Sequence, residues 1–318
     1  MIDFFNECYN RVIKKNKILN RLRLQSIVLF SIRLMANIVL PVYLKSTSHL
    51  KEYSISTAKK KKKGNIVVSL TSFPTRIARL WLVIESILRQ TKKPDRIILY
   101  LSKLQFQNDK SIPSSLIRLK KRGLEIMMVD SDLRSHKKYF YTFSKYPDDY
   151  IITIDDDIIY RKNMIQDLIS GSQNSGSIVA QYCKKIKWEG DSLMPYQSWV
   201  NIVEETEPTS NIFFGSGGGV MFPPGSLHPD TINQDLFMTL CPTADDIWLN
   251  AMCHLNGSRI KKIKCPTDFL PVMYLNNITL EMTNNGQNQN DKQITDVINY
   301  YLESRKIKLF KPSTYNKF

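Results

Sequence analysis

Apolar and polar residues alternate along the middle of the chain with two different periods. Short runs rich in β-branched and other apolar residues predict buried strands at 66–70, 96–101, 124–129 and 150–154. Between the first two runs, apolar residues recur every three or four positions over 77–88, which is the period of a helix. Segments 113–122 and 139–145 are also predicted to be helical. Strands that alternate with helices predict right-handed βαβ units, and therefore an α/β fold with a mostly parallel sheet flanked by helices.

Three consecutive carboxylates, Asp155, Asp156 and Asp157, follow the fourth predicted strand directly. Ligands of an α/β sheet bind beyond the carboxyl ends of its strands, so this loop lies where a site is expected. Adjacent carboxylates repel one another and destabilise the fold unless a cation neutralises them. A divalent ion that also binds phosphate oxygens is the simplest such cation, and oxygen ligands suit Mg²⁺ or Mn²⁺. A helix-capping cluster or a plain acidic turn is the alternative.

Composition excludes several classes of protein. The chain has 318 residues, of which 42% are hydrophobic, so it can bury a full core and is not intrinsically disordered. Its five cysteines form no CxxC pair, which argues against a zinc ribbon or a disulfide scaffold and favours a reducing compartment. The formal net charge is +16, and residues 1–63 carry +11 of it, so the remaining chain is only mildly basic.

Residues 1–63 are predicted to form a basic amphipathic helical arm and linker that ends at the lysine run 59–63. The apolar stretch 27–44 contains Arg33 and Pro41, which makes it a poor bilayer span. As a helix, the arm could place several apolar residues on one face: Ile13, Leu19, Leu22, Ile27 and Leu34. Such a helix is typical of the surface of an anionic membrane, and a helical hairpin packed on the domain is the alternative. No nucleic-acid-binding motif accompanies the charge, so no nucleic acid partner is expected.

Four sequence blocks together resemble GT-A-type nucleotide-sugar glycosyltransferases of the bacterial capsule and O-antigen polysaccharide biosynthesis group. The blocks are VVSLTSFPTRI (67–77), TIDDD (153–157), GSGGGVMFPPGSL (215–227) and PTADDIWL (242–249). They occur in the expected order, and TIDDD resembles the DXD motif of that group. The resemblance implies a GT-A-like, Rossmann-like domain over residues 64–318. Its nucleotide-binding part would span about 64–160 and its acceptor part about 161–318.

The resemblance also implies which residues bind the donor. Asp157 and Asp155 would hold Mn²⁺ or Mg²⁺ against the diphosphate, with Asp155 also near the ribose, and Asp156 fits either role. Further donor contacts are expected from Thr71, Pro74, Arg76, Lys137, Lys138, Gly217, Gly218 and Gly219. For Arg76 and the two lysines the alternative is a solvated surface charge, and for the glycines it is a β-bulge. The Asn-rich segment 282–291 is expected to be a loop that closes over the donor.

PTADDIWL resembles the segment that holds the acceptor-activating carboxylate in inverting members, where the pattern is Glu-Asp at the start of a helix. Asp246 aligns with the catalytic base and Asp245 replaces the Glu, with helix capping as the alternative role. The implied enzyme is an inverting hexosyltransferase that uses a nucleotide-sugar donor, with a UDP-sugar favoured.

The expected acceptor is a growing surface glycan or a lipid-linked glycan. The expected location is the cytoplasm, peripheral at the inner face of the plasma membrane through residues 1–63. A nucleotidyl- or phosphotransferase that uses the same aspartates and a non-catalytic carbohydrate-binding protein are the alternatives.

Overall fold

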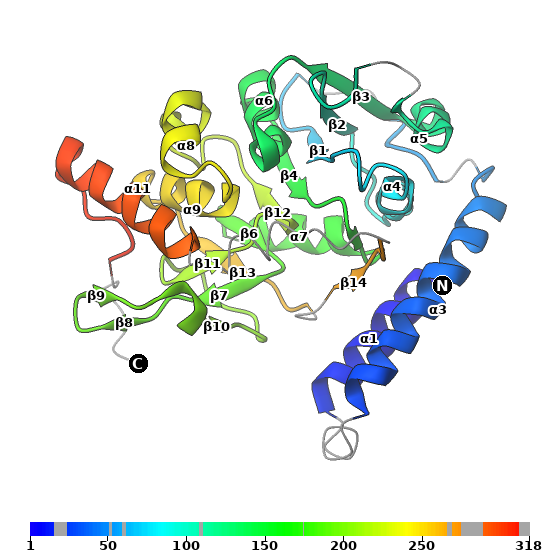
Figure 1. Cartoon of the computed structure of the whole chain (residues 1–318), viewed down its shortest axis with the longest axis horizontal. Helices are drawn as coiled ribbons and strands as arrows, with labels where there is room; N and C mark the ends of the chain where they lie inside the picture. Colours follow the sequence, from blue (N-terminus) through cyan, green and yellow to red (C-terminus); the bar gives the residue numbers. More distant parts are fainter. Residues whose placement is uncertain are drawn as a thin grey trace.

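The structure is a computed structural model. It describes residues 1–15, 24–50, 53–58, 62–107, 111–173, 175–265, 269–274 and 289–311. A seven-stranded sheet lies at its centre (Figure 1). Its strands are β1 (Ile66–Thr71), β2 (Arg96–Ser102), β3 (Leu124–Val129), β4 (Tyr150–Ile154), β6 (Ile178–Ala180), β12 (Gly218–Phe222) and β13 (Ile260–Lys262).

The strand order is β13-β6-β12-β4-β1-β2-β3. Strand β1 pairs in parallel with β2 and β4, β2 pairs in parallel with β3, and β13 pairs in parallel with β6. Strand β12 is antiparallel to both of its neighbours, β4 and β6. The predicted α/β fold with a mostly parallel sheet is therefore confirmed, and the antiparallel strand comes from the glycine-rich block.

Helices cover both faces of the sheet (Figure 1). The helices of this domain are α4 (Leu80–Leu88), α5 (Ser114–Leu119), α6 (Lys137–Lys145), α7 (Met164–Gln173), α8 (Gln234–Leu240), α9 (Asp245–Leu255) and α11 (Gln289–Arg305), with 3₁₀ turns at Lys120–Arg122, Arg134–His136, Tyr196–Ser198 and Pro229–Ile232. Side chains that alternate along β12 enter different cores: Val220 and Phe222 pack with α6 and α9, and Met221 packs with α4 and α7. Burial on both faces explains why the strands read as continuous apolar runs.

Smaller β elements lie beside the main sheet. Strands β7 (Cys183–Lys185), β10 (Val200–Asn201) and β11 (Ile212–Phe214) form a three-stranded antiparallel sheet. Strands β5 (Ile158–Ile159) and β14 (Leu270–Pro271) pair next to the acidic triplet, and β8 (Trp188–Glu189) pairs with β9 (Ser192–Leu193). The five cysteines are free thiols in this structure.

The N-terminal arm is a pair of helices, α1 (Ile2–Lys15) and α3 (Gln25–Ser46), which lie side by side against the domain (Figure 1). Ile2, Leu40 and Leu44 are buried in the core that contains α4 and α7, so the packed-hairpin alternative describes part of the arm correctly. In the stripe expected for the arm, Ile27 and Leu34 are exposed. Leu19, Leu22 and the side chain of Ile13 lie outside the described residues.

Two further expectations fall partly outside the described chain. Residues 59–61 of the lysine run and residues 275–288 are among those that the structure does not describe. The expectation of a loop over 282–291 is wrong for its last three residues, because Gln289, Asn290 and Asp291 form the first turn of α11. The remainder of that loop stays a prediction.

Candidate active site

The acidic triplet emerges from the carboxyl end of β4, and its three carboxylates find different partners. Asp156 turns inward, where its side chain accepts hydrogen bonds from Ser72 Oγ at 2.6 Å and from Arg76 Nη1 at 2.7 Å. The same Arg76 nitrogen lies 2.8 Å from Asp157 Oδ2. Asp155 Oδ1 lies 2.9 Å from Lys138 Nζ. The repulsion expected among the three carboxylates is thus partly relieved by two cations of the chain itself.

Arg76 is a buried partner of the triplet and not a solvated surface charge. Its side chain is 13% exposed, and its guanidinium lies over the rings of Phe73 and Tyr274 at 5.3 and 5.5 Å from their centroids. Burial by itself lowers the pKa of Arg76, but the charges of Asp156 and Asp157 outweigh burial and raise the pKa above its usual value. Arg76 therefore stays charged and fixes two of the three carboxylates.

Lys138 joins the triplet to the second acidic pair. Its Nζ lies 2.9 Å from Asp155 Oδ1 and 2.9 Å from Asp245 Oδ2, and its side chain is only 5% exposed. Burial lowers the pKa of Lys138, but the two neighbouring carboxylates more than compensate and raise it. One buried ammonium group therefore holds residues from the end of β4 and from the start of α9 in a single site.

The two carboxylates at the start of α9 differ in their protonation. Asp245 accepts a hydrogen bond from Ser216 Oγ at 2.6 Å. Burial favours its neutral form, but Lys138 outweighs this effect and lowers the pKa of Asp245. For Asp246, burial and the adjacent charge of Asp245 raise the pKa to about 7. Asp245 is therefore a fixed anion, whereas Asp246 has the proton affinity that a general base needs near neutral pH.

The glycine block packs against the triplet. A Cβ atom at Gly217 would lie 1.7 Å from Asp155 Oδ2, so only glycine fits while Asp155 keeps its position. The Gly217 carbonyl accepts hydrogen bonds from the Asp155 amide at 3.1 Å and from the Tyr160 hydroxyl. Gly219 has a φ of +95°, and the register of β12 shifts between Gly218 and Val220. The β-bulge alternative is therefore present, and the close approach at Gly217 is made by a carboxylate of the chain itself.

Three other expected donor contacts, Lys137, Thr71 and Pro74, have different surroundings. Lys137 pairs with Asp132, and burial lowers the pKa of Lys137. Thr71 lies at the end of β1 and donates a hydrogen bond to the Tyr100 carbonyl at 2.9 Å, and Pro74 is exposed in the turn that follows. The two neighbouring lysines therefore have different partners, because Lys138 pairs with Asp155 and Asp245. Contact of any of these residues with a donor stays a prediction.

Sequence reasoning missed four residues that shape the site: Ser72, Tyr160, Ser216 and Tyr274. Ser72 and Ser216 lie within the blocks that carry the resemblance, so their positions offered a signal. Tyr274 donates a hydrogen bond from its hydroxyl to the Asp156 carbonyl at 2.8 Å across 118 residues of chain. No local pattern predicts that contact.

The donor set fits a divalent cation that is shared with phosphate oxygens. Asp155 and Asp157 have side chains that are 42% and 31% exposed, whereas those of Asp156 and Asp245 are 8% and 9% exposed. Burial, with the charges of Asp155 and Asp156, raises the pKa of Asp157 to about 7 in spite of Arg76. Within the described ranges no group of three or more His, Cys, Asp or Glu side chains could hold a metal ion. Mg²⁺ and similar ions commonly take one or two carboxylates and complete their shell with phosphates and water, so Asp155 and Asp157, the more exposed carboxylates, are the candidate ligands.

No protein-family model matches the chain, and no curated protein matches its sequence. Among solved structures, it is similar to a mannosyltransferase from Pyrobaculum calidifontis in complex with GDP-Man and Mn²⁺, with 12% identity and a TM-score of 0.45 over 90% of this chain and 76% of the other. It is also similar to CMP:2-keto-3-deoxy-manno-octonic acid synthetase complexed with CTP, with 11% identity and a TM-score of 0.37 over 64% of this chain and 89% of the other. At these levels neither likeness assigns a substrate or a metal to this chain.

Proposed function

We propose that the chain is a metal-dependent glycosyltransferase that moves a sugar from a nucleotide-diphosphate donor to a hydroxyl acceptor, with inversion at the anomeric carbon. The observation that carries the proposal is the Lys138 ammonium group, which lies 2.9 Å from both Asp155 and Asp245. It brings the triplet that would hold the donor diphosphate and the helix that carries the candidate base into one site. The four sequence blocks that resemble capsule and O-antigen enzymes with a GT-A fold all meet there.

The residues divide into a donor side and an acceptor side. Asp155 and Asp157 would hold Mn²⁺ or Mg²⁺, which supplies positive charge to the leaving diphosphate when it is bound. Asp246 accepts the proton of the acceptor hydroxyl. At the same time the acceptor oxygen bonds to the anomeric carbon, and the bond from that carbon to the diphosphate oxygen breaks. Asp245 remains ionised and positions Lys138 and the start of α9.

The acceptor and the location follow from the same resemblance and from the basic arm. We propose a UDP-sugar as the preferred donor and a growing surface glycan or a lipid-linked glycan as the acceptor. The enzyme would work in the cytoplasm, at the inner face of the plasma membrane. Among the described residues one helix, α3, is long and apolar enough to cross a membrane by length and composition alone.

The test is to incubate the full chain with UDP- and GDP-sugars and Mn²⁺, and to measure release of nucleoside diphosphate with and without EDTA. The expected result is metal-dependent release, which Asp246→Asn lowers by about 10²-fold or more because the proton acceptor is lost. Asp157→Asn should weaken the response to Mn²⁺. A matched control is Asp130→Asn, which alters an 88% exposed carboxylate in the loop after β3.

Two results would contradict the proposal. Full activity in EDTA would show that the reaction does not depend on a divalent metal. Release of pyrophosphate from a nucleoside triphosphate, with no transfer from any nucleotide sugar, would assign the same aspartates to nucleotidyl transfer.

A further inference from the structure

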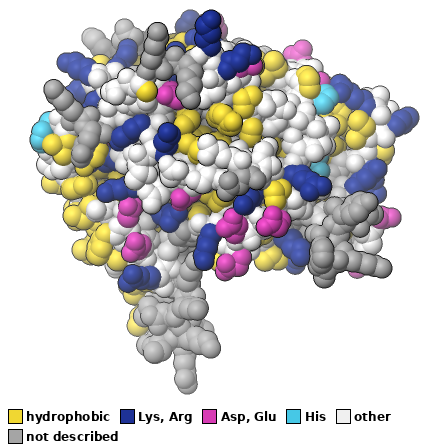
Figure 2. Space-filling view, turned by 180° about the vertical axis from the view of Figure 1, so that it is seen from behind, with side chains coloured by type: hydrophobic (Ala, Val, Ile, Leu, Met, Phe, Trp, Pro, Cys, Tyr) yellow, Lys and Arg dark blue, Asp and Glu magenta, His cyan; other side chains and the backbone are white. Residues whose placement is uncertain are grey.

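Helix α3 presents an apolar face to solvent. Six large apolar side chains on this face are 41–69% exposed: Ile27, Phe30, Leu34, Met35, Ile38 and Val42. Apart from the adjacent pair Leu34 and Met35, they recur at intervals of three and four residues, so they form one stripe along the helix, and Lys45 is exposed at its end. Figure 2 shows apolar side chains gathered along the margin of the molecule where the arm lies. An apolar stripe that covers about four turns of helix marks an interaction surface.

The opposite face of α3 packs against the domain. Ala36, Leu40 and Leu44 are fully buried. Asn37 donates a hydrogen bond to the Pro271 carbonyl at 3.0 Å and accepts hydrogen bonds from the Met273 amide at 2.8 Å and from Arg79 at 3.2 Å. A helix that spans a bilayer would have to give up these contacts or bring the domain into lipid. The surface therefore suits a flat partner that covers one side of the helix only.

The net charge of residues 1–63 indicates which kind of partner binds the exposed face of α3. Residues 1–63 carry a net charge of +11, and α3 contains no acidic residue. A second copy of the chain placed on this face would bring two such arms together, and their charges would repel. An anionic lipid surface offers negative charge to the basic residues and hydrocarbon to the apolar stripe. We propose that α3 lies in the plane of an anionic membrane, with the face defined by Ile27, Phe30, Leu34, Met35, Ile38 and Val42 inserted into the interface.

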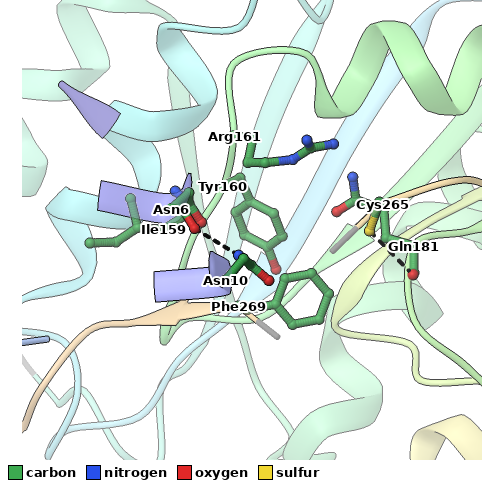
Figure 3. Close-up of a pocket in the computed structure, with 8 residues that line it drawn as sticks. All are labelled: Asn6, Asn10, Ile159, Tyr160, Arg161, Gln181, Cys265 and Phe269. Atoms are coloured by element: carbon green, nitrogen blue, oxygen red, sulfur yellow. Dashed lines mark hydrogen bonds between the residues drawn. The ribbon is translucent and has the colours of Figure 1, made fainter. Parts of the chain in front are cut away.

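The same helix is joined to the acidic triplet by a short chain of contacts. Asn37 hydrogen-bonds to Pro271 and Met273, and Val272 lies between them. The Val272 amide donates a hydrogen bond to the Asp157 carbonyl at 2.7 Å. Helix α1 also meets this region, where the Asn6 side chain donates a hydrogen bond to the Ile159 carbonyl at 3.3 Å. Figure 3 shows Asn6 and Asn10 beside Ile159 and Tyr160 in the lining of a small pocket. Membrane binding through α3 would therefore hold the candidate active site at a fixed distance from the lipid surface.

The test is co-sedimentation of the full chain with vesicles of phosphatidylcholine, with and without phosphatidylglycerol. The test variant is Ile38→Ser with Val42→Ser, and the matched control is Val200→Ser with Val203→Ser, which removes two aliphatic side chains that are 52% and 43% exposed elsewhere. We expect the wild type and the control to bind the anionic vesicles equally. The test variant should bind about tenfold more weakly or worse, because interfacial binding scales with buried apolar area. High salt should weaken wild-type binding.

Several results would overturn the inference. The inference fails if the wild type does not bind anionic vesicles, or if the test variant binds them as well as the wild type does. It also fails if salt and alkali cannot extract the wild-type protein from reconstituted membranes, because α3 would then span the bilayer. A stable dimer that the test variant dissociates would assign the face to a second copy of the chain. Vesicle binding requires no catalysis, so its failure is distinguishable from failure of the proposed transferase activity.

Discussion

Replacement of Gly217 by alanine tests how tightly the glycine block and the acidic triplet are packed. The new Cβ would lie 1.7, 1.8 and 2.2 Å from Asp155 Oδ2, Cγ and Oδ1. Non-bonded carbon and oxygen atoms do not approach below about 3 Å, so the carboxylate must move by more than about 1 Å. That movement breaks the 2.9 Å contact with Lys138, which is then left in a buried position with Asp245 as its acidic partner. Overpacking of this kind costs about 1–3 kcal/mol of unfolding free energy.

The assay is urea unfolding of the wild type, Gly217→Ala, Asp155→Ala and the double variant. Because the clash is with the Asp155 carboxylate, Gly217→Ala should cost less than about 0.5 kcal/mol once Asp155 is alanine. Transferase activity should fall by about 10²-fold in Gly217→Ala, since the triplet is displaced by about 1 Å. An equal loss of stability in both backgrounds would refute the reasoning, because the penalty would then arise elsewhere.

Two further predictions concern charge in the site. Lys138→Met should lower the unfolding free energy by about 3–5 kcal/mol, because Asp245 loses its buried cation. Lys137→Met should lower it by only about 1 kcal/mol, because solvent reaches its partner Asp132. Equal losses for the two variants in urea unfolding would contradict the geometry. Burial raises the pKa of Asp246 from 3.8 to about 7, so the folded state binds this proton more tightly than the unfolded state does. Its contribution to stability is therefore present at low pH and is lost as the pH rises from about 4 to about 7. Relative to the wild type, Asp246→Asn should gain Tm over that range, and parallel Tm curves for the two proteins would argue against the raised pKa.

Local residue pattern was enough to predict the strands and the position of the acidic triplet. The apolar runs gave β1 to β4 within one residue of their observed ends, and the position of the triplet after the fourth run put it at the carboxyl edge of a parallel sheet. Strand period and local hydrophobicity are properties of a few consecutive residues, so these features can be read without knowledge of the rest of the chain. The sequence did not determine how the helical arm packs, because α3 is apolar on both sides. Only tertiary contacts establish which side is covered.

Which charged side chains contact one another depends on long-range packing. Lys137 and Lys138 are neighbours in sequence, but adjacent positions on a helix point about 100° apart, so one reaches Asp132 and the other reaches Asp155 and Asp245. The approach of Gly217 to Asp155 depends on the insertion of β12 beside β4, and the contact from Tyr274 depends on a segment 118 residues away. Sheet order and helix phase set these distances. Both arise from packing between residues far apart in the chain, which no local period encodes.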